Sequence, residues 1–153
     1  SVTRNVEGWD LADCIGARRP AAAMWVLRRL LDQRAEPMQI IGGIESRLRD
    51  LSMLRMALDR GWLRRSDHGV AWIESDEATA TLERLGDWDP RRMHPYRLGR
   101  LVEQAEKFTA EELARCGEAV TRTRERMVGG FSSPELLLEL LVVQIAQPAR
   151  RAR

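Results

Sequence analysis

The sequence predicts an all-α protein, a bundle of about six or seven helices. Apolar residues recur every three to four positions over most of the 153 residues, and this spacing places them on one face of a helix. Several of these stretches begin at a proline, serine or threonine and end at a glycine or proline, as helices do. The composition, 44% hydrophobic and 31% charged, is that of an ordinary globular protein. We expect one helical domain over residues 1–153.

Two helices are expected near the N-terminus. Residues 9–15 predict a short helix that Gly16 ends. Pro20 suits the first turn of a second helix, from whose apolar stripe Trp25 is displaced. That stripe consists of Ala23, Leu27, Leu30, Leu31 and, at its end, Arg34. Because the link at residues 35–37 is short, we expect the second and third helices to pack antiparallel.

A long third helix is predicted from Pro37 to the stop at residues 59–61. Its apolar face is formed by Ile40, Ile44, Leu48, Leu51, Leu54 and Leu58. Gly42 and Gly43 interrupt it, and each costs up to about 1 kcal/mol relative to alanine. Such a pair indicates either a kink or the close approach of another helix, and we favour close packing.

Residues 61–95 form the least regular region and are interpreted as an insertion or linker. Residues 62–63 and 70–73 fit a small hairpin across a turn at residues 67–69, although an irregular loop fits equally well. A short helix is expected over residues 77–85, ended by Gly86.

Two further helices follow this region. Residues 95–108 predict a helix whose inward face is Leu98, Leu101, Val102 and Ala105. Thr109 and Glu112 form a capping box that opens the next helix, which runs to Gly129 and Gly130. Its inward face is Leu113, Cys116, Val120, Thr123 and Met127.

The last helix, within residues 132–147, is apolar nearly all round. Ser132 or Ser133 suits its N-cap, Pro134 its first turn, and Pro148 its end. On a helical wheel, one face consists of Leu136, Leu140 and Val143, and an almost opposite face of Leu137, Leu138, Leu141 and Ile145. Two apolar faces require two partners. We expect one face to pack on the third and sixth helices and the other to lie at a partner interface, for which all seven residues are candidates.

The charge and hydropathy patterns do not favour a protein that binds nucleic acid or spans a membrane. The net charge is +2, and the basic residues are almost all arginines, with doublets at Arg18–Arg19, Arg28–Arg29, Arg64–Arg65, Arg91–Arg92 and Arg150–Arg151. We interpret these doublets as solvated helix faces rather than phosphate sites. No apolar stretch approaches the length of a membrane span and no signal peptide is evident, so a cytoplasmic protein is expected.

No motif for catalysis, a cofactor or a metal is recognisable. A zinc site would need Cys14, His68, His94 and Cys116 to converge from four separate segments, and the simpler expectation is free structural thiols and exposed imidazoles. The sequence contains no phosphate-binding loop, no dinucleotide-binding turn and no nucleophile elbow. Carboxylate pairs such as Glu111–Glu112 stand at helix starts, where they complement the helix dipole.

Several stretches carry a family resemblance through their order and spacing. They are residues 9–16, 23–31, the break at Glu36–Pro37 into Ile40–Ile41, residues 49–51, 95–105, Phe108–Thr109 with Leu113, and 138–141. Together they resemble the C-terminal collar domain of the delta subunit of the bacterial DNA polymerase III clamp loader. The chain departs from that family at Arg124 and Val128, where an acidic residue and a lysine are usual, and residues 61–78 have no clear counterpart.

The resemblance implies a non-catalytic oligomerisation domain that joins gamma/tau and delta-prime subunits in the ring that loads the sliding clamp. The clamp and primed DNA would be reached only through the whole complex, and the ATPase and polymerase chemistry would lie in other subunits. Because the chain starts at Ser1 without methionine, a fragment of a larger protein is expected. The alternatives are a stand-alone nucleic-acid-binding or protein-interaction module, supported only by the arginine doublets, and a small helical enzyme.

Overall fold

The computed structural model describes residues 5–130 and 132–148. Within these ranges the chain forms seven α-helices, two 3-10 helices and one two-stranded hairpin, which confirms the predicted fold class. In chain order the elements are α1 (Gly8–Gly16), α2 (Pro20–Asp32), α3 (Pro37–Asp59), β1 (Leu63–Ser66), β2 (Gly69–Trp72), α4 (Asp76–Leu82), η1 (Glu83–Trp88), η2 (Pro90–Arg92), α5 (Pro95–Ala105), α6 (Ala110–Gly129) and α7 (Pro134–Ile145).

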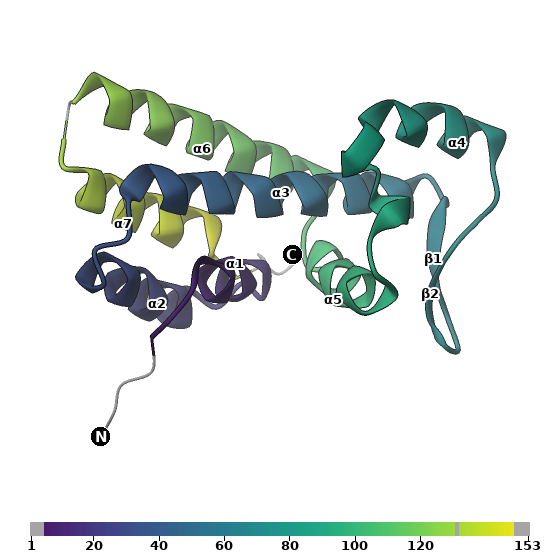
Figure 1. The fold of residues 1–153 in the computed structure, drawn as a ribbon, viewed down its shortest axis with the longest axis horizontal. Coiled ribbons are helices and arrows are strands. Elements are labelled where there is room, and N and C mark those ends of the chain that lie inside the picture. The colour runs from purple at the N-terminus through teal and green to yellow at the C-terminus, as the bar shows by residue number, and fades with distance from the viewer. Residues whose placement is uncertain (1–4, 131, 149–153) are drawn as a thin grey trace, which may run out of the picture.

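Helix α3 runs through the middle of the molecule, and the other elements are arranged around it (Figure 1). It packs mainly against α6 and α5, and also against α1. Helix α7 packs against α6 and α2, while the hairpin and α4 lie toward the C-terminal end of α3. Buried apolar side chains from these elements form one continuous cluster, so the whole arrangement shares a core.

The apolar stripes predicted for α1 and α2 face this core. Leu11 and Ile15 of α1 are buried, as are Ala23, Leu27 and Leu30 of α2. The prediction that α2 and α3 pack antiparallel is wrong, because the main neighbours of α2 are α1 and α7. Helix α2 ends at Asp32, before Arg34, whose φ of 63° turns the chain away from the helical path.

The glycine pair in α3 does not serve close packing. Helix α3 continues through Gly42 and Gly43, and a Cβ atom added at either position would meet no atom within 4 Å. The expectation that another helix of this chain approaches these glycines is therefore wrong. The predicted apolar face itself is confirmed from Ile40 to Leu54, whereas Leu58 is only partly buried and Ala57 replaces it in the core.

Residues 61–95 are more regular than the sequence suggested. Strands β1 and β2 form the hairpin that was one of the two alternatives, with Leu63 opposite Trp72 and Ser66 opposite Gly69. The helix expected over residues 77–85 is α4 followed directly by the 3-10 helix η1. Within η1, Gly86 has a φ of 59°, a conformation that side chains disfavour, and it breaks the helical path where the end was predicted.

The starts of α5 and α6 follow the predicted caps. His94 Nδ1 accepts a hydrogen bond from the backbone N–H of Tyr96 at the start of α5. Thr109 and Glu112 form the predicted capping box, with both hydrogen bonds at 3.0 Å. Helix α6 ends at Gly130, whose φ of 67° is the left-handed conformation usual for a helix stop.

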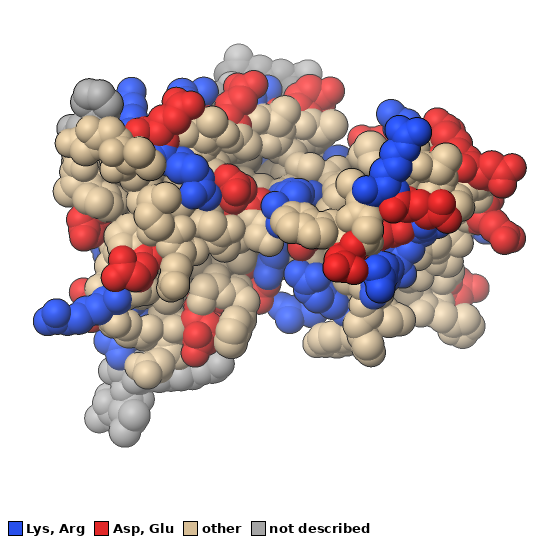
Figure 2. Space-filling view, turned by 45° about the horizontal axis from the view of Figure 1, so that its top comes forward, with Lys and Arg blue, Asp and Glu red and all other residues tan. Residues whose placement is uncertain are grey.

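Acidic and basic side chains are interspersed over the face shown in Figure 2. Four of the five arginine doublets lie in the described residues, and each contributes at least one ion pair: Arg18–Glu112, Arg28–Glu139, Arg65–Glu106, Arg91–Asp89 and Arg92–Asp87. The fifth, Arg150–Arg151, lies outside the described residues. No described helix combines the length and the hydropathy that crossing a membrane requires.

Candidate partner interface

The start of α7 is fixed by its cap. Of the two candidate serines, Ser133 is the N-cap, and its Oγ accepts a hydrogen bond from the backbone N–H of Leu136 at 3.1 Å. Pro134 occupies the first turn, where its missing N–H costs nothing. This cap fixes the residue at which α7 begins.

The two predicted faces of α7 have opposite environments. Leu137, Leu138, Leu141 and Ile145 are each at most 6% exposed, whereas Leu136, Leu140 and Val143 are 48%, 58% and 46% exposed. We call these last three residues the α7 ridge. Four of the seven candidate interface residues therefore belong to the core, and only the ridge is accessible to a partner in this conformation. Val142 and Ala146, which were not singled out from the sequence, are buried with the core face.

The buried face of α7 packs against more helices than predicted. Contacts with α6 and, to a smaller extent, α3 confirm two of the expected neighbours. Helix α2 is a further major neighbour that sequence reasoning missed. The sequence signal for it was Val26, which is buried beside Leu27 and makes the apolar stripe of α2 wide enough to contact two helices.

Two contacts define how α2 and α7 run beside each other. Arg18, just before α2, donates from Nε to the carbonyl oxygen of Gln147, just after α7. Ten residues along, the Arg28 side chain approaches Glu139, with 3.9 Å between Nη2 and Oε2. The beginning of α2 is thus at the end of α7, and the helices are antiparallel. The outward side of α2 carries Ala21, Trp25, Arg28 and Asp32, which are all exposed and which we call the α2 stripe.

Arg18 holds the end of α7 to the junction between α5 and α6. Besides Gln147, its guanidinium donates to the carbonyl oxygen of Lys107 at 2.7 Å and to Glu112 Oε2 at 2.6 Å, and it lies over the Phe108 ring at 4.5 Å. The hydrogen bond from Arg18 lowers the pKa of Glu112 and outweighs the effect of its partial burial. The φ of Arg18 is 57°, and this strained conformation points the side chain into the junction. Nothing in the sequence distinguished Arg18 from the other arginines.

A second polar network joins α1, α3 and α5. Asp13 accepts from Arg47 at 2.7 Å and from Arg100 at 3.0 Å, and Gln104 bridges Asp13 and Arg47. Partial burial acts to raise the pKa of Asp13, but the hydrogen bond and charge of Arg47, aided by Gln104 and Arg100, lower it overall. Gly16 leaves room for this network, because a Cβ there would lie 2.1 Å from Gln104 Oε1.

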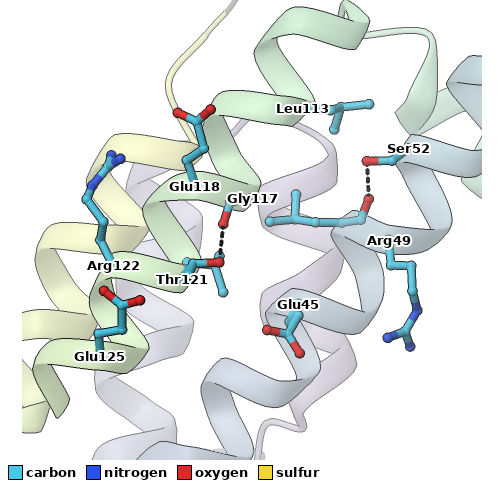
Figure 3. A pocket seen from close by; sticks show the side chains of 11 residues that line it. Glu45, Arg49, Ser52, Leu113, Gly117, Glu118, Thr121, Arg122 and Glu125 are labelled. Carbon is cyan, nitrogen blue, oxygen red and sulfur yellow. Dashed lines mark hydrogen bonds between the residues drawn. The ribbon is translucent and has the colours of Figure 1, made fainter. Parts of the chain in front are cut away.

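A groove of about 580 Å³ lies along the junction of α3 and α6 (Figure 3). Its hydroxyl groups are already bonded within their own helices, Ser52 to the Leu48 carbonyl oxygen and Thr121 to that of Gly117. Its other lining residues are Leu113, Val120 and the charged Glu45, Arg49, Glu118, Arg122 and Glu125. The described residues that line the groove include no histidine, and both hydroxyl groups donate to backbone carbonyl oxygens rather than to a lining carboxylate that could activate them as nucleophiles.

The cysteines and histidines are dispersed. Cys14 lies in α1 and Cys116 is buried in α6, and burial raises the pKa of both thiols. His68 is in the hairpin turn and His94 caps α5. Within residues 5–130 and 132–148, no group of three or more histidine, cysteine or acidic side chains is placed to hold a metal ion.

Comparison with known proteins gives one clear similarity, in structure. No protein-family model and no curated protein sequence matches the chain. Among solved structures, the chain is similar to the Bacillus subtilis DNA clamp loader delta protein (YqeN), with a TM-score of 0.64 and 22% sequence identity. The similarity covers 91% of this chain and 35% of that protein, so the chain spans about a third of its length. The fold is therefore clamp-loader-like.

Proposed function

We propose that this chain is the collar domain of a clamp-loader delta subunit, a non-catalytic oligomerisation domain that acts in DNA replication. Its partners would be the gamma/tau and delta-prime subunits of the same complex. The observation that carries the proposal is the α7 ridge, an exposed row of aliphatic side chains on a clamp-loader-like fold.

The ridge has the properties of an interface rather than of ordinary surface. Single exposed leucines are common, but Leu136, Leu140 and Val143 follow the spacing that brings them together on one side of a helix. The opposite face of α7 is already occupied by the core, so the ridge is free to contact another protein without any change in the fold. Covering it removes apolar surface from water at about 25 cal/mol per Å².

The chemistry of the groove between α3 and α6 supports a non-catalytic role. Its hydroxyl groups donate to backbone carbonyl oxygens of their own helices, and Glu45 is paired with Arg124 at 3.4 Å. In the family that the sequence resembles, ATP hydrolysis belongs to other subunits and clamp opening to the domains that precede the collar. On this proposal the sliding clamp and primed DNA are reached only through the whole complex.

The arginine pattern weighs against direct DNA binding. Arginines from four doublets are engaged with carboxylates of the same chain, and this leaves fewer charges free to neutralise phosphates. A stand-alone nucleic-acid-binding module would bind duplex DNA with a strong salt dependence, which a titration at two salt concentrations measures directly.

The proposal is tested by mixing the 153-residue chain with gamma/tau and delta-prime subunits and measuring assembly by light scattering. We expect association at micromolar concentration and its loss on Leu140→Asp, which places a charge in the middle of the ridge. The control is Tyr96→Asp on α5, where the side chain is 72% exposed and distant in sequence from α7. Absence of association by the unaltered chain would contradict the proposal.

A further inference from the structure

We infer that the partner surface continues from the α7 ridge onto the α2 stripe, and that Trp25 is its principal anchor against an apolar helical face of the partner. This inference rests on the proposed function and adds to it a second helix and a residue to which the sequence assigned no role.

The ridge alone is too small for a stable complex. Full burial of a leucine or valine side chain is worth about 1.5–3 kcal/mol, which corresponds to roughly 60–120 Å² of apolar surface. Because the ridge side chains are only about half exposed, the three together offer on the order of 100–200 Å². A standard interface covers about 800 Å² on each partner. The contact surface must therefore extend over a neighbouring element.

The α2 stripe is adjacent to the ridge. The contact between Arg28 and Glu139 joins an exposed residue of the stripe to the residue directly before Leu140. Since α2 and α7 are antiparallel, the residue one turn before Arg28 lies toward the C-terminal end of α7. That residue is Trp25, which is therefore placed level with the stretch from Leu140 to Val143.

The stripe has the composition of an interface centre. Trp25 is 56% exposed, and its indole alone adds on the order of 100 Å². Tryptophan and arginine are the residue types that most often dominate binding energy, and the stripe has one of each, separated by a single turn. Ala21, one turn before Trp25, is small and leaves space beside the indole for a partner side chain.

Trp25 differs from the other exposed tryptophans in what surrounds it. The ring of Trp88 is already covered by the guanidinium of Arg49, at 3.4 Å from its centroid. Trp9 is 61% exposed but belongs to α1, whose main neighbours are α2, α3 and α5. Trp9 is therefore a matched control: an equally exposed tryptophan on an element of which α7 is not a main neighbour.

The test compares Trp25→Ala with Trp9→Ala in the full 153-residue chain, with affinity for gamma/tau and delta-prime subunits measured by titration calorimetry. We expect Trp25→Ala to weaken binding at least about tenfold, as truncation of an interface anchor does. Trp9→Ala should change it less than about threefold. Because both side chains are largely exposed, both variants should keep the circular dichroism and melting temperature of the unaltered chain.

A second measurement reports contact at Trp25 directly. In a Trp9→Phe/Trp88→Phe variant, Trp25 is the remaining strongly exposed tryptophan, and we expect acrylamide quenching of its fluorescence to fall when the partner is added. Unchanged quenching in a formed complex, or binding that survives Trp25→Ala but not Leu140→Asp, would overturn this inference and leave the proposed function standing. Failure of the unaltered chain to bind either subunit would overturn both.

Discussion

Arg18 is the residue on which the position of α7 depends most directly. Its guanidinium donates to two backbone carbonyl oxygens and to Glu112, from a side chain that is only 10% exposed. The bonded carbonyl groups belong to Lys107 and Gln147, at the ends of two different helical segments. Removing the guanidinium leaves these groups without their donor, and the loss of charge-assisted hydrogen bonds of this kind destabilises the folded state.

We therefore expect Arg18→Ala to lower the free energy of unfolding by about 2 kcal/mol. Its neighbour in the doublet, Arg19→Ala, should change it by less than about 0.5 kcal/mol, because Arg19 is exposed. Urea unfolding of both variants measures the difference. Equal stability of the two variants would show that the Arg18 contacts contribute nothing.

Asp13 and Glu112 give the stability a defined pH dependence. Both carboxyl groups have pKa values lowered below their ordinary values of 3.8 and 4.5. A group with a lowered pKa in the folded state stabilises the fold fully above its ordinary pKa, and this contribution is lost as the pH falls through the lowered value. We expect the melting temperature to hold above about pH 5 and to fall below about pH 4.

The variant Asp13→Asn/Glu112→Gln separates these two groups from the other carboxylates. It should melt lower than the unaltered chain at pH 7, and its melting temperature should fall less steeply between pH 5 and pH 3. Identical slopes for the two proteins over that range would contradict the assignment.

The sequence was least informative about the environments of individual residues. Arg18 and Arg19 are indistinguishable by type and spacing, yet one is buried in a junction and the other exposed. The difference arises from the turn between α1 and α2, whose backbone conformation no periodicity reports. Likewise, the role of Gly16 beside Gln104 depends on a contact between residues far apart in the sequence.

At the scale of elements, helical periodicity predicted apolar faces for the long helices but not which helix covers each face. For α7 the wheel separated two apolar faces without indicating which of them the core would cover, and the structure buries the face of Leu137 and leaves the ridge exposed. That α7 packs more extensively against α2 than against α3 could not be predicted, because the apolar stripe of a helix carries no information about which helix will cover it. The short link at residues 35–37 led to the wrong prediction that α2 and α3 pack antiparallel, because the length of a link does not determine which helix its neighbour packs against.

Gly43 in α3 is a clear case for a stabilising substitution. The residue is exposed within a regular helix, and an added Cβ would meet no atom within 4 Å. Gly43→Ala should therefore raise the free energy of unfolding by up to about 1 kcal/mol, through helix propensity. In a chain of this size that corresponds to a rise of about 2–4 °C in melting temperature.

The control for this substitution is Gly16→Ala, whose Cβ would displace Gln104 from its contacts with Asp13 and Arg47. Thermal unfolding of the two variants should give shifts of opposite sign. A loss of stability in Gly43→Ala would mean that this part of α3 needs glycine for a reason other than space.

At the scale of the whole molecule, the fold class was predictable because the long helices carry apolar stripes or clear caps. The region of residues 61–95 was not, since its short strands and 3-10 turns are held mainly by tertiary contacts, among them those of β1 with α3 and of β2 with α5. The sequence named seven aliphatic residues of α7 as interface candidates, of which the ridge is the exposed part. The α2 stripe was missed because Trp25 stood off the buried face and was given no role.

In the whole molecule, the two faces of α7 have different roles: one face stabilises the fold and the other is assigned to assembly. Leu140 and Leu141 are adjacent in α7, but Leu141 is 1% exposed in the core and Leu140 is on the ridge. Leu141→Ala should cost about 2–5 kcal/mol of folding stability, as cavity-forming substitutions in a core do. Leu140→Ala should cost less than about 1 kcal/mol of folding stability and should instead weaken assembly with the partner subunits.

Chemical unfolding and light-scattering assembly, measured on both variants, give the two halves of this comparison. Because the substitutions are chemically identical and one residue apart, any difference between them reports the environment and not the side chain. Should Leu140→Ala destabilise the isolated chain as much as Leu141→Ala does, the ridge would be part of the folding core, and the reason for assigning it to a partner would disappear.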